Sequence, residues 1–73
     1  MDFFQVYKEA SKKYNLSRTG RLSIYDGCVM RIYRDDLLII VVKTEDQDEL
    51  YERAALELER YMKLHSYIDR KGR

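Results

Sequence analysis

Leu37-Leu38-Ile39-Ile40-Val41-Val42 is a run of six consecutive apolar residues, and it constrains how the rest of this 73-residue chain can fold. A run this short and this rich in β-branched residues predicts a strand that is buried on both faces. Such a strand also needs hydrogen-bonding partners along both of its edges. The rest of the chain offers two shorter strand candidates and two helical segments. We therefore expect a second copy of the chain to help cover this strand.

The length predicts a single small domain, residues 1–68, followed by a basic, frayed tail at residues 69–73. A core of this size is marginal by itself, and chains this small usually gain stability from disulfides, a metal or a second subunit. A single cysteine, Cys28, excludes an internal disulfide and a zinc site built from several cysteines. Association into a homodimer is the route that remains.

The charges are balanced, with 14 Lys and Arg against 13 Asp and Glu, a formal net charge of +1. This balance gives no general attraction to nucleic acid or to an anionic membrane. Charged residues recur through residues 1–15, unlike a secretory signal, and no apolar run approaches the ~20 residues of a membrane span. We expect a cytoplasmic protein, and the small, charged composition is also typical of accessory proteins of mobile elements.

Apolar residues recur at helical spacing on both sides of the central segment. The first such pattern predicts an amphipathic helix from about Asp2, a suitable N-cap, to about Tyr14. The turn formers of residues 15–20 are expected to end it. The second pattern predicts a helix from near Asp46 to about His65 or beyond, with a capping box formed either by Thr44 and Gln47 or by Asp46 and Glu49.

Three strands are expected between these helices, at about residues 21–24, 28–34 and 37–43. Asp35-Asp36 has the length of a two-residue hairpin connection. The predicted fold is therefore α+β: a helix, a three-stranded antiparallel meander and a helix (αβββα), dimeric through a continuous or a packed sheet.

Two registers compete for the first hairpin. A two-residue Asp26-Gly27 turn would mix polar and apolar side chains on both faces of the sheet. A three-residue loop at residues 25–27, with Gly27 in the left-handed conformation, would instead pair Ile24 with Cys28 and Leu22 with Met30. We favour the three-residue loop because it gives one clean apolar face.

The same apolar face would continue through Ile32, Ile39 and Val41 if the second turn is a plain two-residue connection. The opposite face would then carry a set of side chains too apolar to stay in water. These form the predicted dimer interface: Val29, Tyr33, Leu38, Ile40 and Val42. Two copies could join their long strands edge to edge, or pack these faces together.

The predicted order of elements resembles that of the double-stranded-RNA-binding domain. In that family, lysines at the start of the second helix grip phosphates. Here the matching segment, residues 44–49, reads Thr-Glu-Asp-Gln-Asp-Glu, and its acidic groups would repel the backbone of a duplex. The resemblance therefore concerns the order of elements and does not extend to RNA binding.

The leading interpretation is a non-enzymatic homodimeric binding or regulatory module, without a cofactor, whose further protein partner is unidentified. The alternative is a DNA-binding protein that uses Arg21, Arg31 and Tyr33 on the outer face of the sheet. The charge balance favours the first interpretation, and we expect no membrane partner.

No catalytic, cofactor-binding or metal-binding residues are predicted. His65 has no neighbour in the sequence that would activate a nucleophile, and Cys28 falls on the inward face of a strand, where a thiol is unreactive. Asp35 and Asp36 are adjacent turn residues without the further oxygen ligands of a calcium loop. We therefore expect that the protein is not an enzyme.

Overall fold

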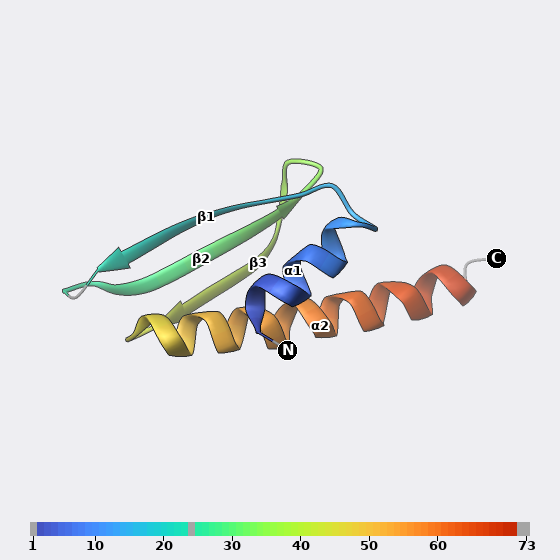
Figure 1. The fold of residues 1–73 in the computed structure, drawn as a ribbon. Coiled ribbons are helices and arrows are strands. Elements are labelled where there is room, and N and C mark those ends of the chain that lie inside the picture. The colour runs from blue at the N-terminus through green and yellow to red at the C-terminus, as the bar shows by residue number, and fades with distance from the viewer. Residues whose placement is uncertain (1, 24, 72–73) are drawn as a thin grey trace.

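The computed structural model confirms the predicted helix, three antiparallel strands and helix, and it describes residues 2–23 and 25–71, without the side chains of residues 67–71. Figure 1 shows the strands side by side with both helices on one side of the sheet. The elements are α1 (Phe3–Ser11), β1 (Leu16–Ser23), β2 (Gly27–Arg34), β3 (Leu37–Thr44) and α2 (Gln47–Lys71). The sheet order is β1-β2-β3, so β1 and β3 are its edge strands.

Helix α1 begins as predicted, because Asp2 is its N-cap and forms a capping box with Gln5. The carboxylate of Asp2 accepts a hydrogen bond from the Gln5 backbone N–H at 2.9 Å, and the Gln5 side chain accepts one from the Asp2 N–H at 3.2 Å. The helix ends at Ser11, three residues before the predicted end at Tyr14.

Strand β1 begins at Leu16, so the prediction of a loop over residues 15–20 and a strand only from Arg21 was wrong. Turn-forming side chains favour a loop locally, but β2 is long enough to pair with this segment, from Leu16 opposite Arg34 to Ser23 opposite Gly27. The hydrogen bonds of that ladder outweigh the local preference. The predicted end of this strand, Ile24, lies outside the described residues.

The first hairpin has the predicted faces but not the predicted register. Leu22 lies opposite Cys28 and not opposite Met30, a shift of two residues that keeps each side chain on its expected face. The hydroxyl of Ser23 accepts hydrogen bonds from the N–H groups of Tyr25 and Asp26, at 3.2 and 3.0 Å, and so fixes where the loop starts. Gly27 has the predicted left-handed conformation, with φ +81°.

The second hairpin contains the predicted two-residue turn, with Asp35 and Asp36 both at positive φ, 52° and 66°. These angles are typical of a type I′ turn, which Asp tolerates. Further along, however, Ile32 lies opposite Ile40 while its neighbour Tyr33 lies opposite Leu38. Ile39 is therefore an extra residue, a β-bulge.

This bulge reverses the predicted faces of β3 beyond it. Ile40 and Val42 are 8% and 5% exposed and face the core, whereas Val41 is 46% exposed on the outer face. The prediction that Ile40 and Val42 lie on the outer face was wrong for this reason. Ile39 is partly buried and packs against the core, as predicted.

Helix α2 begins after Asp46, whose carboxylate accepts a hydrogen bond from the Glu49 N–H at 2.7 Å, so of the two predicted pairs Asp46 and Glu49 supply this capping bond. It runs to Lys71, so the predicted tail at residues 69–73 lies partly in α2 and partly beyond the described residues. Neither helix is long and apolar enough, over the residues described, to cross a membrane.

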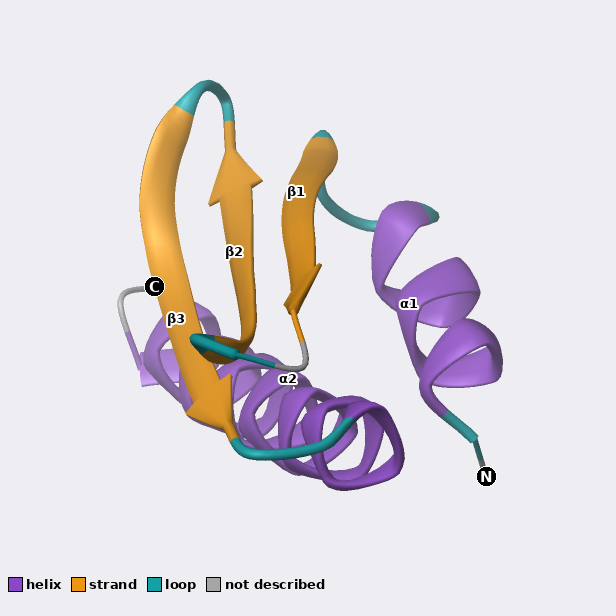
Figure 2. Cartoon of the chain, turned by 90° about the vertical axis from the view of Figure 1, so that its left-hand side faces the viewer, coloured by secondary structure: helices purple, strands orange, loops and turns teal. Residues whose placement is uncertain are grey.

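The core lies between the inner face of the sheet and the two helices. Figure 2 shows α2 beneath the sheet, and α1 beyond the margin that β1 forms. Among the residues that the structure describes, twelve are buried in the core: Phe3, Val6, Ala10, Cys28, Met30, Ile32, Ile40, Val42, Leu50, Ala54, Ala55 and Leu58. Because α2 packs against β2 and β3 from one side and α1 lies on that same side, against α2, the other face of the sheet is left without a covering layer in the described part of the chain.

Candidate interaction surface

The uncovered outer face of the sheet has a regular layout, since the side chains of paired residues lie next to each other across the strands. Three rows cross it from β1 to β3. They are Arg21, Val29 and Lys43; Thr19, Arg31 and Val41; and Ser17, Tyr33 and Leu38. We call these nine residues the outer face. It combines cations, hydroxyl groups and apolar side chains, and it contains no carboxylate.

The apolar part of the outer face lies along β3. Leu38 and Val41 are 50% and 46% exposed, and Leu37, at the start of the same strand, is 71% exposed. The outward edge of β3 has no partner strand in the described residues. An exposed apolar edge of this kind is a template for another strand.

The structure brings three of the five predicted interface residues together. Val29, Tyr33 and Leu38 lie on the outer face, with Val29 and Tyr33 half-buried. Ile40 and Val42 do not join them, because both belong to the core of their own subunit. Val41 takes their place, and sequence reasoning missed it because it placed Val41 in the core.

The three residues of the alternative nucleic-acid face, Arg21, Arg31 and Tyr33, do share the outer face. Lys43 belongs to the same surface, since it lies opposite Val29, which in turn lies opposite Arg21. The sequence reading missed Lys43 because it assumed a plain hairpin, in which residue 43 would point to the other face. Only the bulge at Ile39 brings this lysine to the outer face.

Arg18, on the inner face of β1, is held by aromatic rings of α1. Its guanidinium carbon lies 5.5 Å from the ring centroids of Phe3, Phe4 and Tyr7. At these distances the cation is attracted to the π faces. This contact joins α1 to β1.

Arg34 is the second cation of the inner face, and it is also engaged with aromatic side chains. It donates a hydrogen bond to the Tyr61 hydroxyl at 3.0 Å and lies 4.2 Å from the ring centroid of Tyr14. The hydrogen bond to Tyr61 raises the pKa of the Arg34 guanidinium above its already high ordinary value. The ring of His65 stacks on that of Tyr61 with centroids 4.0 Å apart, so His65 is a packing residue.

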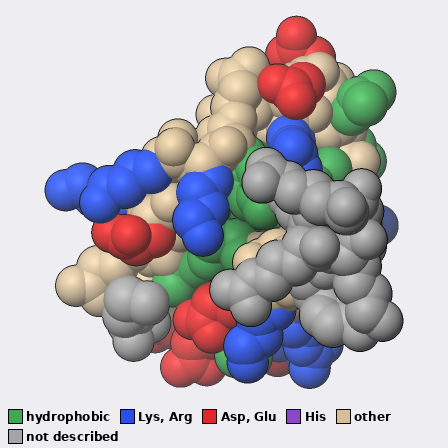
Figure 3. Space-filling model, turned by 90° about the vertical axis from the view of Figure 1, so that its right-hand side faces the viewer, with side chains coloured by type: hydrophobic (Ala, Val, Ile, Leu, Met, Phe, Trp, Pro, Cys, Tyr) green, Lys and Arg blue, Asp and Glu red, His purple; other side chains and the backbone are tan. Residues whose placement is uncertain are grey.

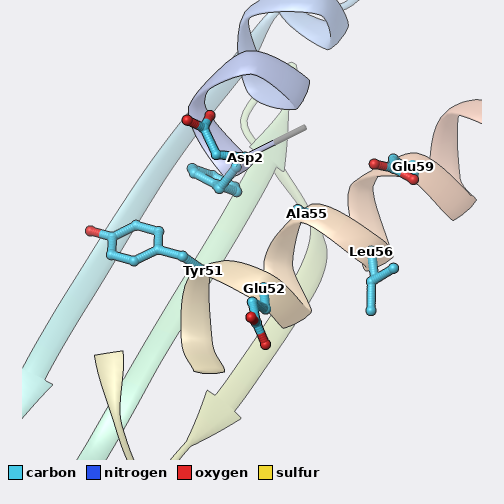
Figure 4. A pocket seen from close by; sticks show the side chains of 7 residues that line it. Asp2, Tyr51, Glu52, Ala55, Leu56 and Glu59 are labelled. Atoms are coloured by element: carbon cyan, nitrogen blue, oxygen red, sulfur yellow. The ribbon is translucent and has the colours of Figure 1, made fainter. Parts of the chain in front are cut away.

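A pocket of about 330 Å³ lies between the N-terminus of α1 and the first half of α2. Figure 4 shows Asp2 approaching from α1 and Tyr51, Glu52 and Glu59 from α2. The three carboxylates point in different directions and do not converge on a common point. Asp2 is moreover engaged in the cap of α1. The pocket therefore lacks the geometry of a cation site.

The described residues include no group of three or more His, Cys, Asp or Glu side chains that could hold a metal ion. Cys28 is buried in the core, where its thiol packs as a small apolar group. Figure 3 views the molecule from the end at which α2 terminates, and it shows cationic and acidic side chains close together with hydrophobic ones between them. Among the side chains that the structure describes, that end shows no surface of a single charge.

Comparison with known proteins gives no relative from which a function could be transferred. No family model matches the chain, and no curated protein and no solved structure matches it significantly. The geometry of the described residues must therefore carry the functional argument.

Proposed function

We propose that the protein is a non-enzymatic homodimeric binding module whose two copies join through β3. The observation that carries this proposal is the free edge of β3 together with the exposure of Leu37, Leu38 and Val41 along that one strand. Two copies related by a twofold axis would pair their β3 strands antiparallel and form a continuous six-stranded sheet.

The bulge limits where this pairing can occur. A bulge disrupts the ladder and increases the local twist, and it is one of the devices that protect an edge strand. It lies at Ile39, near the start of β3, and the register from Ile40 to Thr44 is regular. We therefore place the new ladder on the second half of the strand.

The apolar side chains supply part of the free energy of association. Full burial of a side chain of this size is worth about 1.5 to 3 kcal/mol, so covering the exposed half of Val41, which lies in the paired stretch, would contribute roughly 1 kcal/mol in each copy. Association costs an estimated ~4 to 15 kcal/mol, and strand hydrogen bonds add to the favourable side. A dissociation constant on the order of micromolar corresponds to about −8 kcal/mol, and the strand hydrogen bonds would have to supply most of it.

Sedimentation equilibrium tests the proposal on the wild type and on Val41→Lys. Val41 is half-exposed, so a lysine there leaves the core intact but places two like charges near the proposed junction. Thr19→Lys is the matched control, because it adds the same charge to the same face on the opposite edge strand, β1. Ile40→Lys is unsuitable, since Ile40 is buried in its own subunit and the variant would unfold.

We expect the wild type and Thr19→Lys to be dimers at concentrations well above a micromolar dissociation constant, and Val41→Lys to be a folded monomer. Circular dichroism shows whether each variant is folded. A wild type that stays monomeric at ten times that concentration would overturn the proposal. A Val41→Lys variant as dimeric as the control would show that the copies join through another surface.

A further inference from the structure

Charge is distributed unevenly between the strands and the rest of the chain. The three strands contain five of the 14 Lys and Arg residues, namely Arg18, Arg21, Arg31, Arg34 and Lys43, and none of the 13 Asp and Glu residues. The acidic residues lie in the helices, in the turns and in the segments next to them. The net charge of +1 is therefore the sum of a positively charged sheet and a negatively charged remainder of the chain.

The two sides of the sheet use their cations differently. On the inner face, Arg18 and Arg34 are already engaged with aromatic rings of the subunit. On the outer face, Arg21, Arg31 and Lys43 are exposed and have no covering layer. From this face we propose that the module binds the phosphate backbone of duplex nucleic acid through Arg21, Arg31 and Lys43. This inference deepens the proposed function by naming the class of partner.

The spacing of the three cations suits a duplex. Arg21 and Lys43 flank Val29 in one row, so their backbones are two strand spacings apart, roughly 10 Å, and Arg31 lies two residues further along, roughly 7 Å from that row. A duplex carries one negative charge per about 1.7 Å of its axis, so a stretch of roughly 10 Å presents about six phosphates. All three cations can therefore engage phosphates at once.

The neighbouring side chains fit the same partner. Ser17 and Thr19 are exposed on the outer face beside the cations, and hydroxyl groups donate hydrogen bonds to phosphate oxygens. Arginine guanidinium groups do so in a bidentate geometry. Single strands would instead require a platform of aromatic side chains for base stacking, and on the outer face the aromatic residue is Tyr33, which is half-buried.

One carboxylate competes for this surface. Asp26, in the first hairpin loop, lies 3.5 Å from the Arg21 guanidinium, with both side chains 71% exposed. An ion pair this exposed contributes little, typically about 0 to 1 kcal/mol, so a phosphate can displace the carboxylate. It follows that Asp26→Asn should strengthen binding.

The test is the salt dependence of binding to a labelled duplex, measured by fluorescence anisotropy. Each phosphate neutralised contributes about −0.9 to the slope of log K against log salt concentration. Three cations per copy predict a slope of about −2.7 for a monomer and about −5.4 for a dimer, with dissociation constants on the order of 10⁻⁴ to 10⁻⁶ M near physiological salt. The slope therefore separates failure of the dimer from failure of this inference.

We expect Arg21→Ala, Arg31→Ala and Lys43→Ala each to reduce the steepness of the slope by about 0.9 per copy, for every duplex sequence tested. Arg53→Ala, which removes an exposed cation from α2, is the matched control and should leave it unchanged. All four positions are exposed, so the variants remain folded.

Absence of binding at low salt, or an equal effect of Arg53→Ala on the slope, would overturn the inference. So would tighter binding to a single strand or to phosphatidylserine vesicles than to the duplex.

Discussion

Ile32 of β2 lies opposite Ile40 of β3, and both side chains are buried, at 0% and 8% exposure. A two-residue turn at Asp35-Asp36 would by itself place Ile39 opposite Ile32. The bulge at Ile39 shifts the strand by one residue, and this shift turns Ile40 and Val42 toward the core and Val41 and Lys43 toward the outer face. One extra residue thus determines both the core and the candidate interaction surface.

Deleting Ile39 tests this role of the bulge. The deletion removes the extra residue but keeps Ile40 opposite Ile32 and Val42 opposite Met30, so the chain should fold with a loss of about 1 to 2 kcal/mol for the partly buried Ile39. A straighter edge should also favour pairing of two β3 strands, and therefore tighten self-association. Urea unfolding and sedimentation measure the two effects.

Val42→Thr and Val41→Thr form a matched pair that tests the assignment of the faces. Val42 is 5% exposed and faces the core, so a threonine there buries a hydroxyl group and should cost about 1 to 3 kcal/mol. Val41 is 46% exposed on the outer face, so the same change should stay within about 0.5 kcal/mol. If both substitutions destabilised the protein equally, the bulge would not be the feature that assigns the faces of β3.

The sequence predicted the order of elements, both helix starts and the second turn, because each depends on local signals such as Asp2 at a helix start or Asp35-Asp36 between two strands. It could not predict the bulge. The run from Leu37 to Val42 has no polar residue, so a shift of one position still buries apolar side chains, and the pattern does not select a register. The position of Lys43 on the outer face depends on the bulge, so the sequence could not predict it either.

Gly27→Ala should destabilise the first hairpin. Gly27 has φ +81°, and an added Cβ would lie 2.9 Å from the backbone oxygen of Thr44, which is a clash. The left-handed conformation alone costs a residue with a Cβ about 1 to 2 kcal/mol. We expect a loss of at least that size in the free energy of unfolding, measured with urea.

Gly20→Ala provides the comparison. Gly20 has no positive φ, and its added Cβ would lie 3.6 Å from the Val29 oxygen, an ordinary contact. Because glycine inside a strand is less favourable than alanine, this variant should gain about 0.5 to 1 kcal/mol. A destabilised Gly20→Ala would mean that the residue has a role in β1 beyond its backbone.

Asp2→Ala should weaken the start of α1, since it removes the acceptor that satisfies the Gln5 N–H. Loss of such a cap costs about 1 kcal/mol, which corresponds to about 4 to 8 °C in the melting temperature of a domain this size. Asp2→Asn keeps an acceptor at the same position and should melt within about a degree or two of the wild type. Equal melting temperatures for all three proteins would show that packing of Phe3 and Val6 holds this end without the cap.

The hydrogen bond from Arg34 to the Tyr61 hydroxyl should join the end of β2 to the middle of α2 with a measurable coupling energy. In a double-mutant cycle of Arg34→Met and Tyr61→Phe, we expect a favourable coupling energy clearly above the error of the measurement, because the donor is charged. Tyr14→Phe is the control: the Arg34 guanidinium faces the ring of Tyr14, which phenylalanine retains, so the coupling between Arg34 and Tyr14 should be near zero.

The hydrogen bond raises the pKa of Arg34 in the folded state. Its stabilisation is therefore fully present below the pKa of the unfolded state and is lost only as pH rises through the pKa of the folded state. The coupling should therefore be the same at about pH 6 and about pH 9, both of which lie below the range in which Arg34 loses its proton. A Tyr61 coupling no larger than that of Tyr14 would mean that the two elements are held together by packing alone.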